Sequence, residues 1–360
     1  MLPYLIIYFS IFAFSCLLCV KSEKYESISY IIYILIIGLF CSLFYIRDFS
    51  IGIDTYAYSE IFYDLYFLNN VFDVIDYAID NNFEIGFIYF SYILSKLFSQ
   101  SLVFSIYAAI IYFNYIFILK KIKINPIIYF MAFFSYFGVY LWSLNILRQM
   151  VAVSFVVLGS YYLAKNKNSV FLLFLTVATF FHYSAIVCIV FLILKRNLNF
   201  FYKFRFFLII ITIFLSKILL VLVSSYYDRY YSYATASNME NIGIMLMIFY
   251  IFTFLLNDFF GRKIKIYKDY FKFFTVIFSI YIALQFSFLI NNISNYGTTR
   301  IVIYFLWPSV FIWGIFFKNI KDANVRFLLV TLFVSFLTFY WFLVLKKSSS
   351  DIIPFKYFMY

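Results

Sequence analysis

Long apolar runs constrain this chain more than any other feature of its sequence. Stretches such as Ile31–Phe44 and Phe206–Leu222 are apolar on nearly every side, whereas a transmembrane β-barrel needs segments in which apolar and polar residues alternate. Hydrophobic residues make up 66% of the chain and charged residues 12%, against about 45–50% and about 25% in soluble domains. A soluble enzyme, a disordered chain and a disulfide-stapled secreted domain are thereby excluded.

The apolar runs predict an all-α, polytopic integral membrane protein with about 11–13 transmembrane or re-entrant helices. We expect one membrane domain over residues 1–360, because we find no linker rich in Gly or Pro and no internal repeat. The first run lacks a basic leader and a cleavage site, so we expect it to be retained as a span. The runs are Leu2–Val20, Ile28–Ile46, Leu102–Leu119, Pro126–Leu141, Met150–Ala164, Val170–Leu194, Phe206–Ser224, Ile242–Leu256, Phe273–Ile290, Ile301–Phe317 and Phe327–Leu345.

The formal net charge of +12 would suggest nucleic-acid binding in a soluble protein, but here it follows from membrane topology. Cytoplasmic loops of membrane proteins carry an excess of Lys and Arg. We therefore expect no nucleic-acid partner and place the basic clusters on the inner side. These clusters are Lys120–Lys123, Lys165/Lys167, Lys195–Arg205, Arg262–Lys272 and Lys318–Arg326.

Two segments must depart from simple spans if all basic clusters lie on one side. Val170–Leu194 has a cluster at each end, so we expect it to go out and return as two short helices that turn near His182. Glu84–Phe98 must be re-entrant or tilted, since otherwise Lys120–Lys123 would lie outside. Irregular backbone at membrane depth is tolerated where it is buried or lines a cavity, so both segments indicate a site. The outward segments are then Arg47–Asn82, Trp142–Asn145, Ser225–Asn241, Asn291–Arg300 and the C-terminal tail.

The largest outward segment is an acidic extracytoplasmic loop over residues 47–83. Its apolar residues recur at helical spacing, which predicts a short amphipathic helix lying on the membrane surface. The residues of that apolar stripe are Tyr58, Ile61, Phe62, Leu65 and Leu68, and the acids of the loop are Asp48, Asp54, Glu60, Asp64, Asp73, Asp76 and Asp80.

Arginines on the outer side are not explained by topology. The four outer arginines are Arg47, Arg148, Arg229 and Arg300. Arg47 ends a span, whereas Arg148 and Arg300 each begin one. An arginine fork pairs bidentately with phosphate or carboxylate, so three at one depth indicate a site for an anionic ligand such as pyrophosphate. The alternative is that each pairs with a neighbouring acid or a lipid phosphate. Asn145 and Gln149 flank Arg148 and add neutral donors at a helix N-terminus, which itself attracts anions.

Three further polar positions have two interpretations each. Asp54, which follows Gly52 and precedes Tyr58, either caps the next helix or acts as a general base or orients an arginine. Glu84 either caps the helix that follows it or pairs with an outer arginine. His182, the one histidine of the chain, is either a packed side chain or a general base or hydrogen-bond donor near neutral pH.

No metal or cofactor is expected. One histidine excludes a multi-histidine metal site, and no second cysteine pair or nearby histidine completes a site with Cys16 and Cys19. Cys41 and Cys188 also lie in apolar runs, as small buried hydrophobic residues do.

The ordered set of these motifs resembles the EpsG-like branch of the Wzy polysaccharide polymerases, of the GT-C glycosyltransferase class. The resemblance extends over nearly the whole chain, with Phe355 as a departure where the family usually has Tyr. The motifs that carry it are Arg47…Gly52-x-Asp54…Tyr58, Glu84-x-Gly86, Asn145-x-x-Arg148-Gln149, Phe181-His182-x-Ser184-Ala185, Arg300 and Asp351-x-x-Pro354-Phe355-Lys356-Tyr357.

The resemblance implies a membrane glycosyltransferase that polymerises lipid-linked repeat units for O-antigen (lipopolysaccharide), capsule or exopolysaccharide. It implies transfer of a glycan from undecaprenyl pyrophosphate to a hydroxyl at the non-reducing end of a new lipid-linked unit. The reaction would be inverting, metal-independent and located at the outer, periplasmic face of the bacterial inner membrane. Arg148 and Arg300 would hold pyrophosphate, with Arg47 orienting it or anchoring the acidic loop, and His182 or Asp54 would be the base. Further contacts to the substrate would come from Gln149, Asn145, Glu84 and Tyr58. A chain-length regulator and a flippase would be partners by family.

Two other classes of protein compete with a polymerase. An O-antigen ligase or another sugar-lipid transferase would use the same arginines and histidine with a different acceptor. A polysaccharide flippase or transporter would instead place charges at the membrane midplane and show inverted repeats, and we find neither in the sequence.

Overall fold

The structure, a computed structural model, describes residues 2–20, 26–133, 139–226, 264–290 and 295–347, with isolated positions between 251 and 261. Regular secondary structure in these ranges is helical, and seven of the helices are long and apolar enough to cross a membrane. The prediction of an all-α polytopic membrane protein is therefore confirmed. Outside the described residues lie Arg229, Arg262, Asn291 and Asn292, the C-terminal motif, and most of the predicted segments Ser225–Asn241 and Ile242–Leu256.

The chain forms two compact units. Unit 1 comprises Met1–Gly159, Ser169–Ile186 and Asp322–Tyr360, and unit 2 comprises Ser160–Asn168 and Val187–Lys321. Each unit contains candidate membrane spans. The expectation of one membrane domain over the whole chain therefore stays a prediction.

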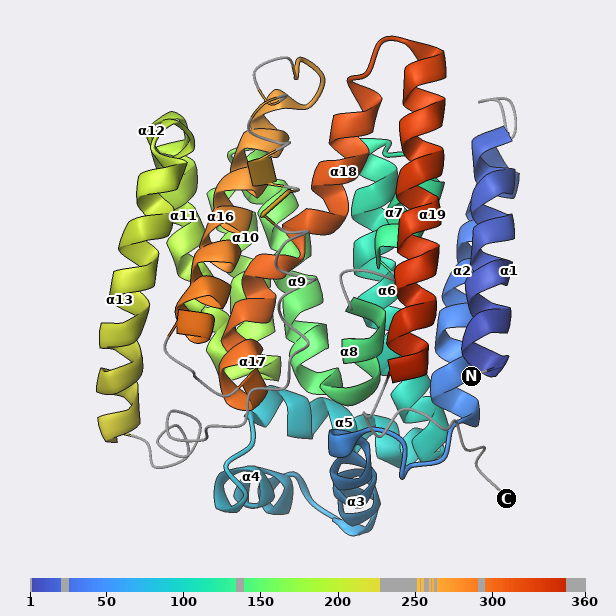
Figure 1. Cartoon of the computed structure of the whole chain (residues 1–360). Coiled ribbons are helices and arrows are strands. Elements are labelled where there is room, and N and C mark those ends of the chain that lie inside the picture. Colours follow the sequence, from blue (N-terminus) through green and yellow to red (C-terminus); the bar gives the residue numbers. More distant parts are fainter. Residues whose placement is uncertain are drawn as a thin grey trace. The chain divides into compact units, whose positions relative to one another are not determined.

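Long helices form the body of unit 1 (Figure 1). α2 packs along α6 through the stacked rings of Phe40 and Tyr112, whose centroids lie 4.4 Å apart. α1 is joined to α19 by a 2.8 Å hydrogen bond between the hydroxyls of Tyr8 and Thr338. The long helices are α1 (Leu2–Val20), α2 (Glu26–Ile46), α6 (Gln100–Ile122), α9 (Leu147–Ala164, to Gly159 in unit 1), α10 (Asn168–Phe181, from Ser169) and α19 (Ala323–Lys347). Between α6 and α9 lie two helices of one to two turns, α7 (Pro126–Met131) and α8 (Val139–Asn145).

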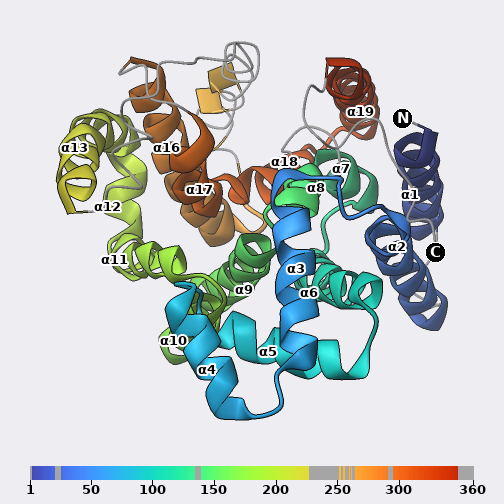
Figure 2. The ribbon, with the colours of Figure 1, turned by 90° about the horizontal axis from the view of Figure 1, so that it is seen from below.

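Three short helices lie across one end of unit 1, steeply inclined to its long helices (Figures 1 and 2). They are α3 (Ile53–Phe67), α4 (Val71–Asp80) and α5 (Ile85–Leu97). α5 has 13 residues, fewer than the about 17–25 that a spanning helix needs. The prediction that Glu84–Phe98 departs from a full span agrees with this length and inclination.

α3 lies in the acidic loop, where the sequence predicted a short helix, and one of its faces is buried. Tyr58, Ile61, Phe62 and Leu65 are buried, and the Phe62 ring meets the rings of α5 and α6 at centroid distances of 5.0–6.4 Å. The opposite face is aromatic rather than purely polar, since it exposes Tyr56, Tyr63, Tyr66 and Phe67. Whether this face lies on a membrane surface stays a prediction.

The predicted break near His182 is confirmed. α10 ends at Phe181, and a 3₁₀-helix, η3 (Tyr183–Ile189), begins directly after His182. η3 starts in unit 1 and ends in unit 2. The run Ile301–Phe317 is also divided, which was not predicted: two helices meet at Trp307, because Pro308 lacks the N–H that would continue the first one. Together they form one of the seven candidate spans, Arg300–Lys318.

Unit 2 is arranged around α16, which contacts each of the helices α11, α12, α13, α17 and α18. The packing includes Phe274 of α16 against Trp307, with centroids 5.0 Å apart, and a 2.6 Å hydrogen bond from Ser216 to Ser287. The helices are α11 (Val190–Arg196), α12 (Leu198–Lys203), α13 (Arg205–Tyr226), α16 (Lys268–Ile290), α17 (Asn295–Leu306) and α18 (Pro308–Lys318).

The two ends of unit 1 differ in charge. Gln100, at the start of α6, donates to the Ser59 carbonyl of α3. Lys120 and Lys121 lie in the last turn of the same helix, so about 30 Å separate Gln100 from Lys120 at 1.5 Å per residue. The acidic helices and the basic cluster therefore lie far enough apart to face opposite sides of a bilayer.

The sidedness of these ends can be tested with single cysteines at exposed positions. In a chain whose native cysteines are replaced, Asp76→Cys in α4 should react with a membrane-impermeant maleimide in intact cells. Lys121→Cys should react only after the membrane is permeabilised, because the hydrocarbon core separates the two ends. Labelling of both positions in intact cells would contradict the predicted orientation.

Candidate active site

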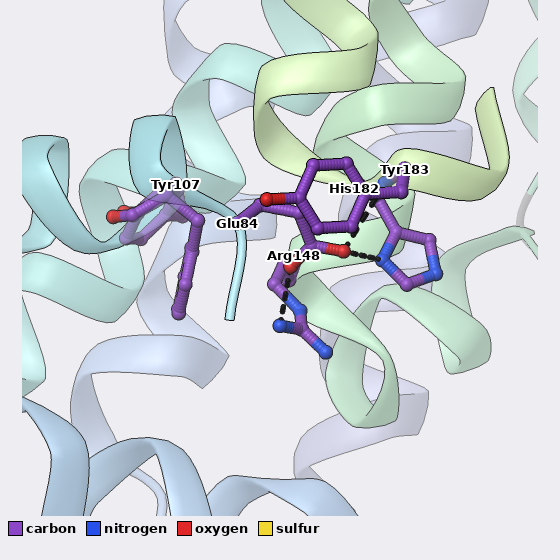
Figure 3. A network of polar contacts seen from close by, with 6 residues as sticks. Glu84, Tyr107, Arg148, His182 and Tyr183 are labelled. Carbon is purple, nitrogen blue, oxygen red and sulfur yellow. Dashed lines mark hydrogen bonds and ion pairs between the residues drawn. The ribbon is translucent and has the colours of Figure 1, made fainter. Parts of the chain in front are cut away.

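The Glu84 carboxylate joins three segments of unit 1 (Figure 3). Arg148 donates from Nη1 to Oε2 at 2.5 Å. Oε1 lies 2.7 Å from Nδ1 of His182 and accepts from the Tyr183 backbone N–H at 3.1 Å. Glu84 precedes α5, Arg148 lies in the first turn of α9, and His182 follows α10. The carboxylate therefore brings together residues 64 and 98 positions apart in the chain.

Gly86 explains how Glu84 comes so close to the end of α10. A Cβ at position 86 would lie 2.6 Å from Phe180 Cβ and 2.8 Å from its carbonyl oxygen. Real Cβ atoms do not approach other atoms so closely, so only glycine lets α5 lie directly against the backbone two residues before His182. The Glu84-x-Gly86 motif thus places a carboxylate and the helix contact that positions it within one turn.

Glu84 is buried, with 4% of its side chain exposed. Burial alone raises the pKa of its carboxyl, but the hydrogen bond with His182 and the charge of Arg148 outweigh burial and hold the pKa below its ordinary value. The carboxylate is therefore ionised at neutral pH. The geometry distinguishes between the two interpretations of Glu84. Its side chain makes no capping hydrogen bond at the N-cap position of α5 and pairs with Arg148 instead.

The ionised carboxylate determines which nitrogen of His182 carries the proton. A carboxylate only accepts hydrogen bonds, so Nδ1 is the donor toward Glu84 and the lone pair of the neutral ring lies on Nε2. The same arrangement orients imidazoles that act as general bases, because the acceptor holds the ring and stabilises the imidazolium that forms. The His182 side chain is 15% exposed.

Arg148 lies where the sequence predicted it, in the first turn of a span. Its guanidinium lies over the rings of Phe83 and Phe87, at 5.1 and 5.4 Å from their centroids. Nε is buried and has no hydrogen-bond partner in the structure. An arginine that keeps an unsatisfied N–H beside a helix N-terminus is suited to an anionic ligand.

Arg47 has a different environment. Its side chain is 1% exposed, its Nη1 donates to the Leu144 carbonyl at 2.6 Å, and the rings of Phe44 and Phe104 flank it. A guanidinium enclosed in this way is not open to a ligand. The burial favours the second role anticipated from the sequence, anchoring the loop, over direct contact with pyrophosphate.

The turn after Arg47 packs on the same carbonyl. Gly52 has a φ of 94°, and a Cβ there would meet Asn145 Oδ1 at 2.4 Å. Thr55 donates to the Leu144 carbonyl at 3.2 Å. The loop is thus fastened to the end of α8, three residues before Arg148.

The remaining predicted site residues are distributed over both units. Gly52, not Asp54, occupies the N-cap position of α3, so the capping interpretation of Asp54 is wrong, and this half-buried side chain lies in the first turn. Tyr58 is buried and packs on Phe87. Asn145 ends α8, and Gln149 is buried in α9. Arg300 lies in α17 of unit 2 and is half-buried.

The sequence did not single out Tyr107, which lies beside the Glu84 cluster in Figure 3. Its hydroxyl is 2.6 Å from the Ser91 hydroxyl, which holds α6 against α5. Among 37 tyrosines nothing in the local sequence distinguishes this one. The sequence also did not identify the backbone N–H of Tyr183 as part of the site. The helix break after Phe181 was a signal for it, because a break leaves backbone N–H groups without an intrahelical acceptor.

These observations define the class of the protein. It is a polytopic helical membrane protein with a cluster of titratable side chains at one end of unit 1. Within the described residues, no group of three or more His, Cys, Asp or Glu side chains is arranged to hold a metal ion. The sequence profile of the EpsG family matches residues 30–357, so the chain belongs to that family. Membership supports a polysaccharide-polymerase function of glycosyltransferase type. No curated protein and no solved structure matches the chain.

Replacing Gly86 should separate Glu84 from His182. Gly86→Ala forces the new methyl group into the Phe180 backbone, at a cost of about 1–3 kcal/mol, and should lower the thermal unfolding midpoint in detergent and polymer formation in cells. Gly38→Ala is the matched control, since nothing lies within 4 Å of a Cβ there. Equal behaviour of the two variants would contradict the close contact.

The lowered pKa of Glu84 predicts a pH-dependent stability. In the unfolded chain the carboxyl takes up a proton near a pKa of about 4.3, whereas in the folded protein it does so at lower pH. The stabilisation is therefore complete above the unfolded pKa and is lost as the pH falls through the folded value. We expect wild type to unfold at a higher temperature than Glu84→Gln at neutral pH, with the gap shrinking in acid. A constant gap would argue against an ionised Glu84.

Proposed function

We propose that the chain polymerises oligosaccharide repeat units carried on undecaprenyl pyrophosphate, at the outer face of the bacterial inner membrane. The oxygen of an acceptor hydroxyl attacks the anomeric carbon of the donor glycan and forms the new glycosidic bond. The bond from that carbon to the phosphate oxygen breaks, and undecaprenyl pyrophosphate leaves with the electron pair. A single displacement of this kind inverts the anomeric centre.

The observation that carries this proposal is the shared carboxylate of Glu84, which holds an imidazole on one oxygen and a guanidinium on the other. A displacement at an anomeric carbon needs a base for the attacking hydroxyl and positive charge for the leaving group. His182 and Arg148 are residues of these two types, and one buried anchor fixes both. The proposal therefore needs no metal.

His182 is the proposed general base. The hydroxyl proton passes to Nε2 while Nδ1–H stays on Glu84. Glu84 itself is a weak base because its pKa is lowered, so its role is to orient and stabilise the imidazolium. His182 is preferred over Asp54, because His182 shares the Glu84 carboxylate with Arg148.

Arg148 is the proposed contact to the pyrophosphate, and the role predicted for Arg300 stays a prediction. The unsatisfied Nε of Arg148 and the N-terminus of α9 both favour a phosphate oxygen. Charge stabilisation of this type often accelerates a reaction more than any other single effect. Asn145 and Gln149 are proposed as neutral groups near this ligand, and Arg47 positions the segment through Leu144.

The acidic loop is proposed to contact the sugars. The outward face of α3 exposes Tyr56, Tyr63 and Tyr66, and aromatic rings present apolar faces with a polar tip. Sugar rings have apolar faces of matching size, and their hydroxyls can donate hydrogen bonds to carboxylates. Asp64, whose Oδ2 accepts from the Tyr77 hydroxyl at 3.0 Å, lies on the same helix.

The proposal is tested by the surface glycans of a strain that lacks the gene. The deletion should leave single repeat units, and wild-type protein should restore a ladder on a gel. His182→Ala and Arg148→Ala should each reduce polymerisation by about 10²–10⁴-fold, the range for a general base or a main charge stabiliser. Glu84→Gln should fall between these variants and wild type.

Tyr183→Phe is the matched control, because the site uses only the backbone N–H of this residue and its side chain is exposed. It should polymerise like wild type at an equal protein level. A normal ladder with His182→Ala would remove the proposed base. Loss of all surface glycan without a short intermediate in the deletion strain would contradict a polymerase and favour a transporter or ligase.

A further inference from the structure

Unit 2 contains a solvent-open cavity of about 440 Å³ where α11 ends, α12 begins and α16 starts, and most of its lining residues are exposed. All three helices contact one another in this unit, as can be followed in Figure 1. The lining residues are Lys195, Arg196, Asn197, Leu198, Asn199, Phe200 and Asp269.

The wall of this cavity carries more positive than negative charge. Lys195 and Arg196 oppose the one carboxylate, Asp269. Lys272 adds a third cation directly behind the wall, since its Nζ donates to Asn199 Oδ1 at 2.7 Å. This contact occupies the oxygen of the Asn199 amide and leaves Nδ2 as its donor end.

The charged form of Lys195 is destabilised by burial, because its ammonium group loses part of its hydration. Burial lowers the pKa of its ammonium group, and the charge of Asp269 only partly opposes this effect. A half-buried cation whose desolvation is incompletely compensated gains from an added anion. Positive-inside topology explains why basic residues occur at this end, but not why they and two amides surround a cavity.

The geometry points to a binding site for a phosphate group in this cavity, supplied by the headgroup of an anionic phospholipid or by a soluble phosphate ester. Lys195 and Arg196 pair with the phosphate oxygens, and the Asn199 amide adds a neutral donor. Phe200, 58% exposed, gives an apolar rim for the adjoining acyl or organic portion. Basic pockets beside membrane helices bind acidic headgroups in the same way. The site uses none of the residues proposed for polymerisation.

Thermal unfolding of the purified full-length protein in neutral detergent tests this site. Dioctanoyl phosphatidylglycerol should raise the unfolding midpoint in a saturable manner, whereas dioctanoyl phosphatidylcholine should not. Lys195→Gln and Arg196→Gln should each raise the half-saturating concentration about fivefold, which corresponds to about 1 kcal/mol. Asp269→Asn should lower it, because the one repelling charge is removed.

Lys203→Gln is the matched control, since it removes the same charge from exposed α12 without lining the cavity. It should leave the half-saturating concentration unchanged. Sodium phosphate that saturates at or below the phosphatidylglycerol concentration would support the site and assign it to a soluble ester. The proposal would be overturned if the two lipids changed the unfolding midpoint equally and phosphate did not change it. It would also be overturned if Lys203→Gln and Arg196→Gln raised the half-saturating concentration equally.

Discussion

A buried carboxylate that accepts hydrogen bonds from two distant segments of the chain, the start of α9 and the end of α10, organises unit 1. An isolated carboxylate loses far more hydration energy on burial than a fold of marginal stability tolerates. Glu84 is stable where it is because a guanidinium, an imidazole and a backbone N–H each donate to it. Removing one donor leaves a buried charge short of partners, at a cost of about 3–5 kcal/mol for a broken buried ion pair. The relative placement of α5, α9 and the end of α10 depends on this contact.

The parts of the fold that the sequence predicted are those that local patterns determine. Apolar runs defined the spans, and the spacing of Tyr58, Ile61, Phe62 and Leu65 defined the buried face of α3. The break at His182 followed from basic residues at both ends of one run. The separation of α17 from α18 was missed although Pro308 was visible, because the apolar run continues through it.

The candidate site was less predictable, since tertiary contacts decide it. Arg47 and Arg148 both stand at span ends, and nothing in the sequence distinguishes the side chain that is enclosed by Phe44 and Phe104 from the one that meets Glu84. Glu84 had two open interpretations for the same reason. Gly86 offered the one local clue, since a glycine two residues after an acid at a helix start indicates close approach of another backbone.

The Glu84–Arg148 pair also bears on turnover. In the proposed reaction the leaving pyrophosphate is the product that must depart before the next cycle. An arginine without a counter-ion would hold that dianion about as well after the reaction as during it, and such uniform binding slows release without lowering the barrier. Because Glu84 already occupies one edge of the guanidinium, phosphate competes with a carboxylate that is permanently in place. In the proposed reaction, the resident carboxylate would compete with the product for Arg148 and so favour product release.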